Sequence, residues 1–166
     1  MTAARQQRKE TRAPIAAFAL VFGLLIGPPP GSAAGITERI VVDQHTGLAI
    51  GGYDPVAYHT DAKPLPGSPD LELQYGGAVW RFCNIGNRAA FADRPDVYMP
   101  QFGGYDPVGV ARGVAVAGNP DTWLISGGRL FLSYDRNRLE TFAADPDRIT
   151  SAAERKWPDV QRTLSP

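Results

Sequence analysis

The chain has 166 residues, with 17 basic and 17 acidic side chains and a single cysteine, Cys83. One cysteine excludes an internal disulfide, so the fold must depend on apolar burial. Balanced charge, with no basic run after residue 35, argues against electrostatic binding of nucleic acid, and no nucleic-acid partner is expected.

Residues 1–34 show the three-part pattern of a secretory signal peptide. Basic residues between Arg5 and Arg12 precede the apolar stretch 13–27, and small residues follow at Ser32 and Ala34. The apolar stretch is shorter than the roughly 20 residues that a membrane-spanning helix needs. We therefore expect a cleaved signal peptide and a periplasmic or secreted protein with no stable membrane span. An uncleaved N-terminal membrane anchor is the alternative.

The expected mature part, residues 35–166, has the usual size of one domain, with a core at about 47–158. The N-terminal segment holds four of the 17 basic residues and one of the 17 acidic residues, so 13 basic and 16 acidic residues remain. The domain is therefore mildly acidic.

A six-residue phrase, GGYDPV, occurs at 51–56 and again at 103–108. Paired glycines give access to left-handed backbone angles, Asp suits a helix N-cap, and Pro suits the first helical position. Each copy predicts a tight turn that starts a short helix.

Between the two copies, residues 71–75 alternate apolar and polar side chains, as do residues 78–83 after Gly76-Gly77, which predicts a β-hairpin. Short extended segments are expected before it, at 38–43 and 47–50. Asn84 is a plausible N-cap for a helix that ends at Asp93-Arg94-Pro95.

After the second copy, a short helix is expected at 108–112 and a second hairpin at 122–133 across Gly127-Gly128. Asp135 caps a helix to about Ala144, and Pro146 opens a last helix that runs through Trp157. The expected fold is a single α+β domain, a small antiparallel sheet built from two hairpins with short helices packed on it. No Gly-rich phosphate loop follows a strand, so a nucleotide-binding fold is not expected.

The order of these motifs resembles the YHS-domain proteins of bacteria, of the long exported type. The residues that carry the resemblance are GGYDPVAY, the strand Trp80-Arg81-Phe82, the helix Asn87-Arg88-Ala89-Ala90-Phe91 with Asp93, Pro95 and Tyr98, then Gln101-Phe102-Gly103-Gly104-Tyr105, the hairpin 123–133 and Lys156-Trp157-Pro158. The short members of this family place cysteines in Asp-Pro-Val-Cys and Phe-Cys-x-x-x-Cys segments and are linked with heavy metals, copper especially. The resemblance implies a non-enzymatic binding domain for copper, zinc or a small ligand.

The chain departs from this pattern at the cysteines. Ala57 follows Asp-Pro-Val and Asn87 stands where the next cysteine would fall, so only Cys83 remains. Long members often carry Gly-Gly-Tyr-Cys in the later turn, where this chain has Asp106. The second GGYDPV is therefore interpreted as local convergence rather than duplication. A single thiolate does not make a tight copper or zinc site, which takes two to four nitrogen or sulfur ligands.

The residues that could complete a metal site with Cys83 are the two histidines and the two repeated aspartates: His45, His59, Asp54 and Asp106. No Cys-x-x-Cys or His-x-x-x-His spacing supports the grouping. In the alternative interpretation both histidines are surface residues at loop ends and both aspartates are helix caps.

Cys83 and two further residues, both tyrosines, each have two interpretations. Cys83 lies beside Arg81 and a helix N-terminus, which would lower its pKa and favour a reactive thiolate, whereas lone cysteines are most often small buried hydrophobes. Tyr53 and Tyr105, before the two helix starts, could line one cleft for an anionic ligand, or belong to the core.

Three functions follow. The preferred one is an exported YHS-like binding domain for a metal ion (copper or zinc) or a small ligand. The alternatives are a metal-free structural or interaction module of the cell envelope and a thiol-dependent enzyme that uses Cys83. No complete catalytic constellation is visible, which favours a non-enzymatic protein.

Overall fold

The helices and strands form two halves of similar construction, one after each GGYDPV copy. The computed structural model describes residues 39–164, so the predicted signal peptide lies outside the described residues. The first half contains η1 (Ile50–Gly52), α1 (Ala57–Thr60), β1 (Ser68–Tyr75), β2 (Ala78–Phe82), α2 (Ile85–Asp93) and α3 (Pro95–Tyr98). The second half contains η2 (Gln101–Gly104), α4 (Pro107–Ala111), β3 (Trp123–Ser126), β4 (Arg129–Leu132), α5 (Arg136–Ala144) and α6 (Pro146–Thr163).

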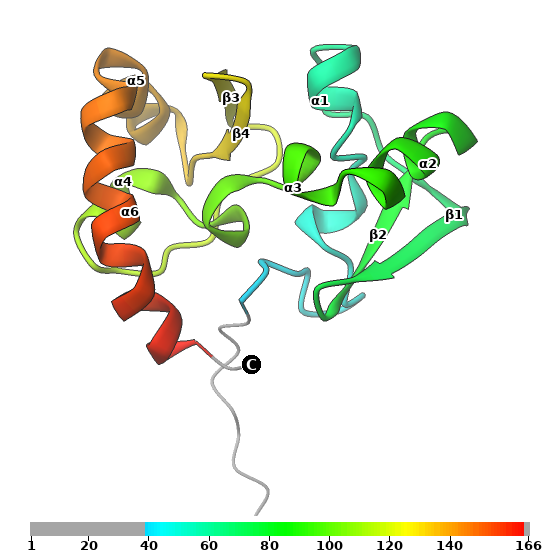
Figure 1. Ribbon diagram of the computed structural model, residues 1–166, viewed down its shortest axis with the longest axis horizontal. Helices are drawn as coiled ribbons and strands as arrows, with labels where there is room; N and C mark the ends of the chain where they lie inside the picture. Colours follow the sequence, from blue (N-terminus) through cyan, green and yellow to red (C-terminus); the bar gives the residue numbers. More distant parts are fainter. Residues whose placement is uncertain (1–38, 165–166) are drawn as a thin grey trace, which may run out of the picture. The chain divides into compact units, whose positions relative to one another are not determined.

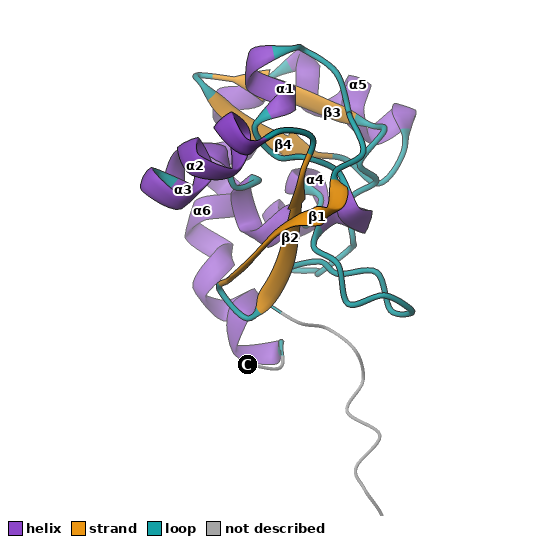
Figure 2. Ribbon diagram, turned by 90° about the vertical axis from the view of Figure 1, so that its right-hand side faces the viewer, coloured by secondary structure: helices purple, strands orange, loops and turns teal. Residues whose placement is uncertain are grey.

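Both predicted hairpins are confirmed, and with them the α+β fold class. Strands β1 and β2 pair antiparallel across Gly76-Gly77, and β3 and β4 pair antiparallel across Gly127-Gly128. The hairpins do not join into one sheet, since each forms its own two-stranded sheet. Figure 1 shows β1, β2 and α2 to the right, α4, α5 and α6 to the left, and the β3–β4 hairpin between them. Figure 2 shows β1–β2 facing the viewer with α4 and α6 behind.

The helix caps expected at Asn84, Asp106 and Asp135 are present, whereas the expected cap at Asp54 is not, because Val56 occupies the N-cap position of α1. The Asn84 side chain accepts a hydrogen bond from the Asn87 amide at the start of α2, and Asp135 accepts one from the Arg138 amide at the start of α5. The prediction for the last helix was wrong at its C-terminus, because α6 continues past Pro158 to Thr163 instead of ending at Trp157. Among residues 39–164, no helix is long and apolar enough to cross a bilayer.

The resemblance between the halves extends well beyond the hexapeptide. The main-chain hydrogen bonds repeat in equivalent pairs. The Asp54 amide donates to Leu65 O and the Asp106 amide donates to Val116 O, both at 2.8 Å. The Gly67 amide donates to Gly52 O and the Gly118 amide donates to Gly104 O, both at 2.9 Å. Equivalent residues differ by 52 in number in the turns, as Gly51 and Gly103 do, and by 51 from residue 65 onward, because the second connecting loop is one residue shorter. Local convergence of six residues does not explain this extent, which favours duplication.

Each half has its own apolar core, built around an equivalent phenylalanine. Phe91 of α2 packs against Trp80 of β2 in the first core, with ring centroids 5.0 Å apart. Phe142 of α5 packs against Phe131 of β4 in the second core, with centroids 4.7 Å apart. Burying one large aromatic side chain contributes roughly 1.5–3 kcal/mol, so these pairs stabilise each half substantially.

The strand β4 is buried on both faces and therefore belongs to both cores. Phe131 points into the second core, whereas Leu130 and Leu132 pack in the first core with Trp80. In β2, the residues between the buried positions, Val79 and Arg81, are only partly buried. The second hairpin thus completes the core of the first half.

A short segment before the first turn also connects the halves. The Val41 amide donates to Gly103 O at 2.8 Å, and the Val41 carbonyl accepts from the Ile50 amide at 3.0 Å. The expected strand at 38–43 is therefore an extended segment that hydrogen-bonds both GGYDPV turns, with one antiparallel bridge between Val42 and Ala49.

Candidate functional site

The aspartate of the first GGYDPV is fully buried, and both of its oxygens are occupied. Asp54 Oδ1 accepts from the Val56 amide at 2.9 Å, and Oδ2 accepts from the Cys83 amide at 2.9 Å and from Asn87 Nδ2 at 2.7 Å. A buried carboxylate needs such partners. Asp54 therefore ties the turn to the end of β2 and the start of α2, a structural role.

The aspartate of the second copy makes the equivalent connection. Asp106 Oδ1 accepts from the Gly109 amide and, at 3.1 Å, from the Arg138 guanidinium, while Oδ2 accepts from the Tyr134 amide at 3.0 Å. Tyr134 and Arg138 are the positions equivalent to Cys83 and Asn87. Both aspartates thus hold the hairpin and the following helix against the turn.

Cys83 lies next to Asp54, and its sulfur accepts weak hydrogen bonds from the Asn84 and Asn87 side-chain amides, each at 3.4 Å. Burial, followed by the hydrogen bond and the negative charge of Asp54, raises the pKa of Cys83 to about 11. The expectation that Arg81 and the helix N-terminus would lower this pKa was wrong, because the nearest charged group is a carboxylate and Arg81 pairs with Glu72 at 2.8 Å.

The two histidines lie in different surroundings. His45 is exposed in the turn after Asp43, as the alternative interpretation expected. His59 packs edge-on against Tyr98, with ring centroids 5.5 Å apart, and burial lowers its pKa. Within residues 39–164, no three or more His, Cys, Asp or Glu side chains form a group that could hold a metal ion. Of the five predicted metal ligands, the structure brings only Cys83 and Asp54 into hydrogen-bond contact.

Tyr53 and Tyr105 occupy equivalent positions in the two turns, each in a β-bridge, to Pro66 and Ala117 respectively. Burial and the carboxylate of Asp121 raise the pKa of Tyr53. The Tyr105 ring packs at 6.1 Å from Trp157. The two side chains contact different parts of the fold, and neither lines the cavities of about 230, 240 and 170 Å³ that described residues form.

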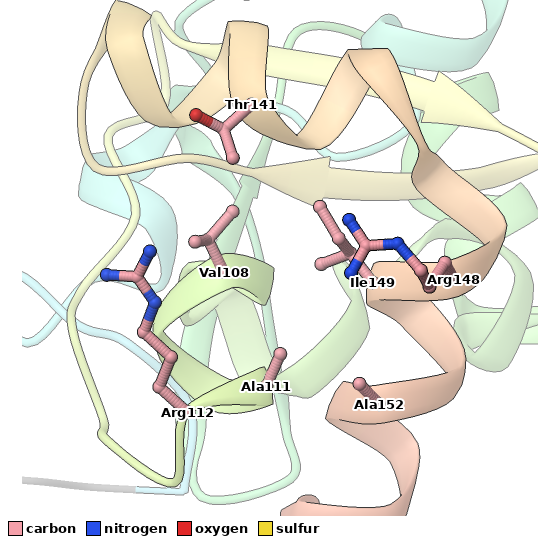
Figure 3. Close-up of a pocket in the computed structure, with 7 residues that line it drawn as sticks. All are labelled: Val108, Ala111, Arg112, Thr141, Arg148, Ile149 and Ala152. Carbon is pink, nitrogen blue, oxygen red and sulfur yellow. The ribbon is translucent and has the colours of Figure 1, made fainter.

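One of these cavities, of about 230 Å³, lies within the second half between α4, α5 and α6 (Figure 3). Its floor consists of the apolar side chains Val108, Ala111, Ile149 and Ala152, with Thr141 above them. Figure 3 shows the guanidinium groups of Arg112 and Arg148 on opposite sides of this floor. We call this cavity the α4–α6 pocket.

The equivalent space in the first half is occupied by two rings. Counting along the repeat, His59 corresponds to Ala111 and Tyr98 corresponds to Ile149. His59 and Tyr98 pack against each other, whereas the smaller Ala111 and Ile149 both line the pocket. The pocket is thus open in the second half because its ring pair is missing.

Sequence reasoning did not identify any of the pocket residues. Small apolar side chains are unremarkable in a sequence, and only alignment of the two halves places Ala111 opposite a histidine. Compared with known proteins, the chain matches no family model, no curated protein and no solved structure. The resemblance to YHS-domain proteins therefore stays a prediction.

Proposed function

We propose that the chain is a non-enzymatic binding domain whose small ligand occupies the α4–α6 pocket. The observation that carries this proposal is the difference between the halves at one equivalent place, where His59 and Tyr98 fill the first half and Ala111 and Ile149 leave about 230 Å³ in the second. The proposal keeps the expected function of a binding domain and moves its site away from Cys83 and the two aspartates.

The chemistry of the lining supports a ligand site. Ligand pockets combine an apolar surface with a few polar groups that fix orientation. Val108 and Ile149 supply buried apolar surface, and Arg112 and Arg148 supply the polar groups. The Thr141 hydroxyl donates to Asn137 O within α5 at 2.8 Å. Export of this domain through the predicted signal peptide is a separate proposal, which N-terminal sequencing of the protein from its producing cell tests.

The test transfers the residues of the first half into the pocket. In the variant Ala111→His with Ala152→Gln, both pocket residues take the identity of their first-half equivalents, His59 and Gln101. The full-length chain, labelled with ¹⁵N, is titrated with isovalerate and isovaleramide and followed by NMR. We expect amide shifts centred on α4 and the start of α6 in the original chain and none in the double variant.

Two further variants control this experiment. Ala152→Gln alone places a larger side chain at the pocket floor with less risk to the fold, and it should weaken binding. His59→Ala removes the ring from the first half and should leave binding at α4 and α6 unchanged. Shifts that persist in the double variant, or that centre outside α4, α5 and α6 in the original chain, would contradict the proposal, as would the absence of shifts with both probes.

A further inference from the structure

We infer that the ligand of the α4–α6 pocket is a small organic monoanion, with its acid group between Arg112 and Arg148 and a short apolar part on Val108, Ala111 and Ile149. This inference rests on the proposed function and names the chemical class of its ligand. It is carried by the charge of the pocket, by its size and by a second difference between the two halves.

Arg112 supplies an uncompensated positive charge at the pocket. It stands at the C-terminal end of α4, where its backbone amide donates to Gly109 O at 2.9 Å. Its side chain is exposed and makes no hydrogen bond or ion pair with any other residue of 39–164. The planar guanidinium matches a carboxylate or phosphate oxygen pair. Arg112 is therefore free to bind an acid group.

Arg148, on the opposite side, is already neutralised in part. Its Nε donates to Asp145 Oδ2 at 2.6 Å, and its other guanidinium N–H groups are available for a ligand. The pocket therefore has one unpaired cation, Arg112, and one cation that is paired with a carboxylate, Arg148. Its net charge of one positive unit matches a ligand with a single negative charge. This balance favours a monoanion, such as a carboxylate, over a doubly charged phosphate.

The size of the cavity limits the rest of the ligand. Pockets for drug-sized ligands have volumes of about 300–1,000 Å³. The α4–α6 pocket, at about 230 Å³, falls below that range. Its floor is apolar, since Val108 and Ile149 are buried side chains. The fitting ligand is therefore a short acid with a few carbon atoms, linear or branched.

The positive charges occur only in the half that has the pocket. The first-half residues equivalent to Arg112 and Arg148 are Thr60 and Val97, neither of which is charged. Thr60 uses its hydroxyl locally, donating to Val56 O at 3.2 Å. The open space and the two cations thus coincide in one half and are both missing from the other, although neither feature requires the other for folding.

The experiment compares two probes of nearly the same shape that differ in charge. The full-length chain is titrated at neutral pH with isovalerate, which is ionised, and with isovaleramide, which is neutral, and dissociation constants are obtained from the NMR shifts of α4 and α6. A charge-assisted hydrogen bond stabilises more than a neutral one, so we expect the acid to bind roughly tenfold more tightly.

Substitutions assign this preference to the arginines. Arg112→Gln should weaken isovalerate binding roughly tenfold and leave isovaleramide binding unchanged. It should not impair folding, because the Arg112 side chain has no partner within the described residues. The matched control is Arg162→Gln, which removes the same charge from α6, where Arg162 pairs with Asp159 away from the pocket. It should change neither constant.

The outcomes separate this inference from the proposed function. If acid and amide bind equally well and the double variant Ala111→His with Ala152→Gln abolishes both, the inference of an anionic ligand is wrong. The proposal of a small-ligand pocket then still holds. If inorganic phosphate binds as tightly as isovalerate, the inference that the ligand has an apolar part is wrong. Shifts outside α4–α6, or none with either probe, would overturn both proposals.

Discussion

The two halves share a structural framework and differ in the side chains that pack on it. Each keeps a buried aspartate that binds the amide after the hairpin, an N-cap on the following helix, and a phenylalanine in the core. Above that framework, the first half has the ring pair His59–Tyr98 and the second has a pocket flanked by two arginines. The comparison separates residues that maintain the fold from residues that are free to change with function.

The largest effect is expected where the halves are most alike. Asp54→Ala and Asp106→Ala each leave three donors without an acceptor, and each should lower the free energy of unfolding by about 3–5 kcal/mol. Urea denaturation measures both, with the exposed Asp70→Ala as control. A mild effect of either substitution would show that the two aspartates do not share one structural role.

The thiol offers a second comparison. With its pKa raised to about 11, Cys83 is protonated at neutral pH, and iodoacetamide should alkylate it about a hundredfold more slowly in the folded than in the urea-unfolded chain. The equivalent position in the second half is tested by Tyr134→Cys in a Cys83→Ser background. There the equivalent carboxylate, Asp106, is paired with Arg138, whose guanidinium lies 5.9 Å from the Tyr134 ring, so this thiol should react faster than Cys83. Equal rates would show that the neighbouring charges do not control the thiols.

The glycines that open the two turns should respond differently to alanine. Gly51 and Gly103 both have left-handed backbones, with φ of 65° and 63°. A Cβ at Gly51 has ordinary contacts, the nearest at 3.8 Å, whereas at Gly103 it would lie 2.0 Å from the Arg39 carbonyl oxygen. Gly51→Ala should cost about 1 kcal/mol, from backbone strain alone.

Gly103→Ala should cost about 3 kcal/mol, because it also displaces the segment that donates the Val41 hydrogen bond. Thermal or urea unfolding of both variants gives the difference. Equal costs would mean that residues 39–42 do not stabilise the second turn.

The smallest effect concerns the ring pair itself. Burial lowers the pKa of His59 below the ordinary value of 6.5, so the unfolded chain binds a proton more readily than the folded chain. The stability that neutral His59 provides is complete above that value and decreases as the pH falls below 6.5. His59→Gln should flatten this decrease in urea denaturation between neutral and mildly acidic pH. The exposed His45→Gln is the control, and an unchanged slope in His59→Gln would contradict the assignment.

Much of the fold was predictable because its signals are local. Paired glycines marked both hairpin turns, and Asn84 and Asp135 marked helix starts within three residues of their hydrogen-bond partners. The hexapeptide repeat was equally visible. The full extent of the repeat was not visible, because it appears in long-range hydrogen bonds. Asp54 binds groups of Cys83 and Asn87, which lie 29 and 33 residues further along the chain.

The candidate site was less predictable for two reasons. The metal ligands were predicted from the chemical type of their side chains, and the fold uses two of them, Asp54 and Asp106, as buried hydrogen-bond acceptors. The pocket instead depends on a side chain being small, as Ala111 is, and a small residue has meaning only relative to the residue that fills the same place in the other half.

The two-sided burial of β4 has a consequence for how the chain folds. Leu130 and Leu132 complete the first core, yet they come after the whole first half in the chain. The first half must therefore wait, with Trp80 and Phe91 incompletely covered, until β4 arrives between the two cores. The two halves repeat one structure, but the shared strand β4 makes their folding interdependent. They should therefore unfold in a single cooperative transition.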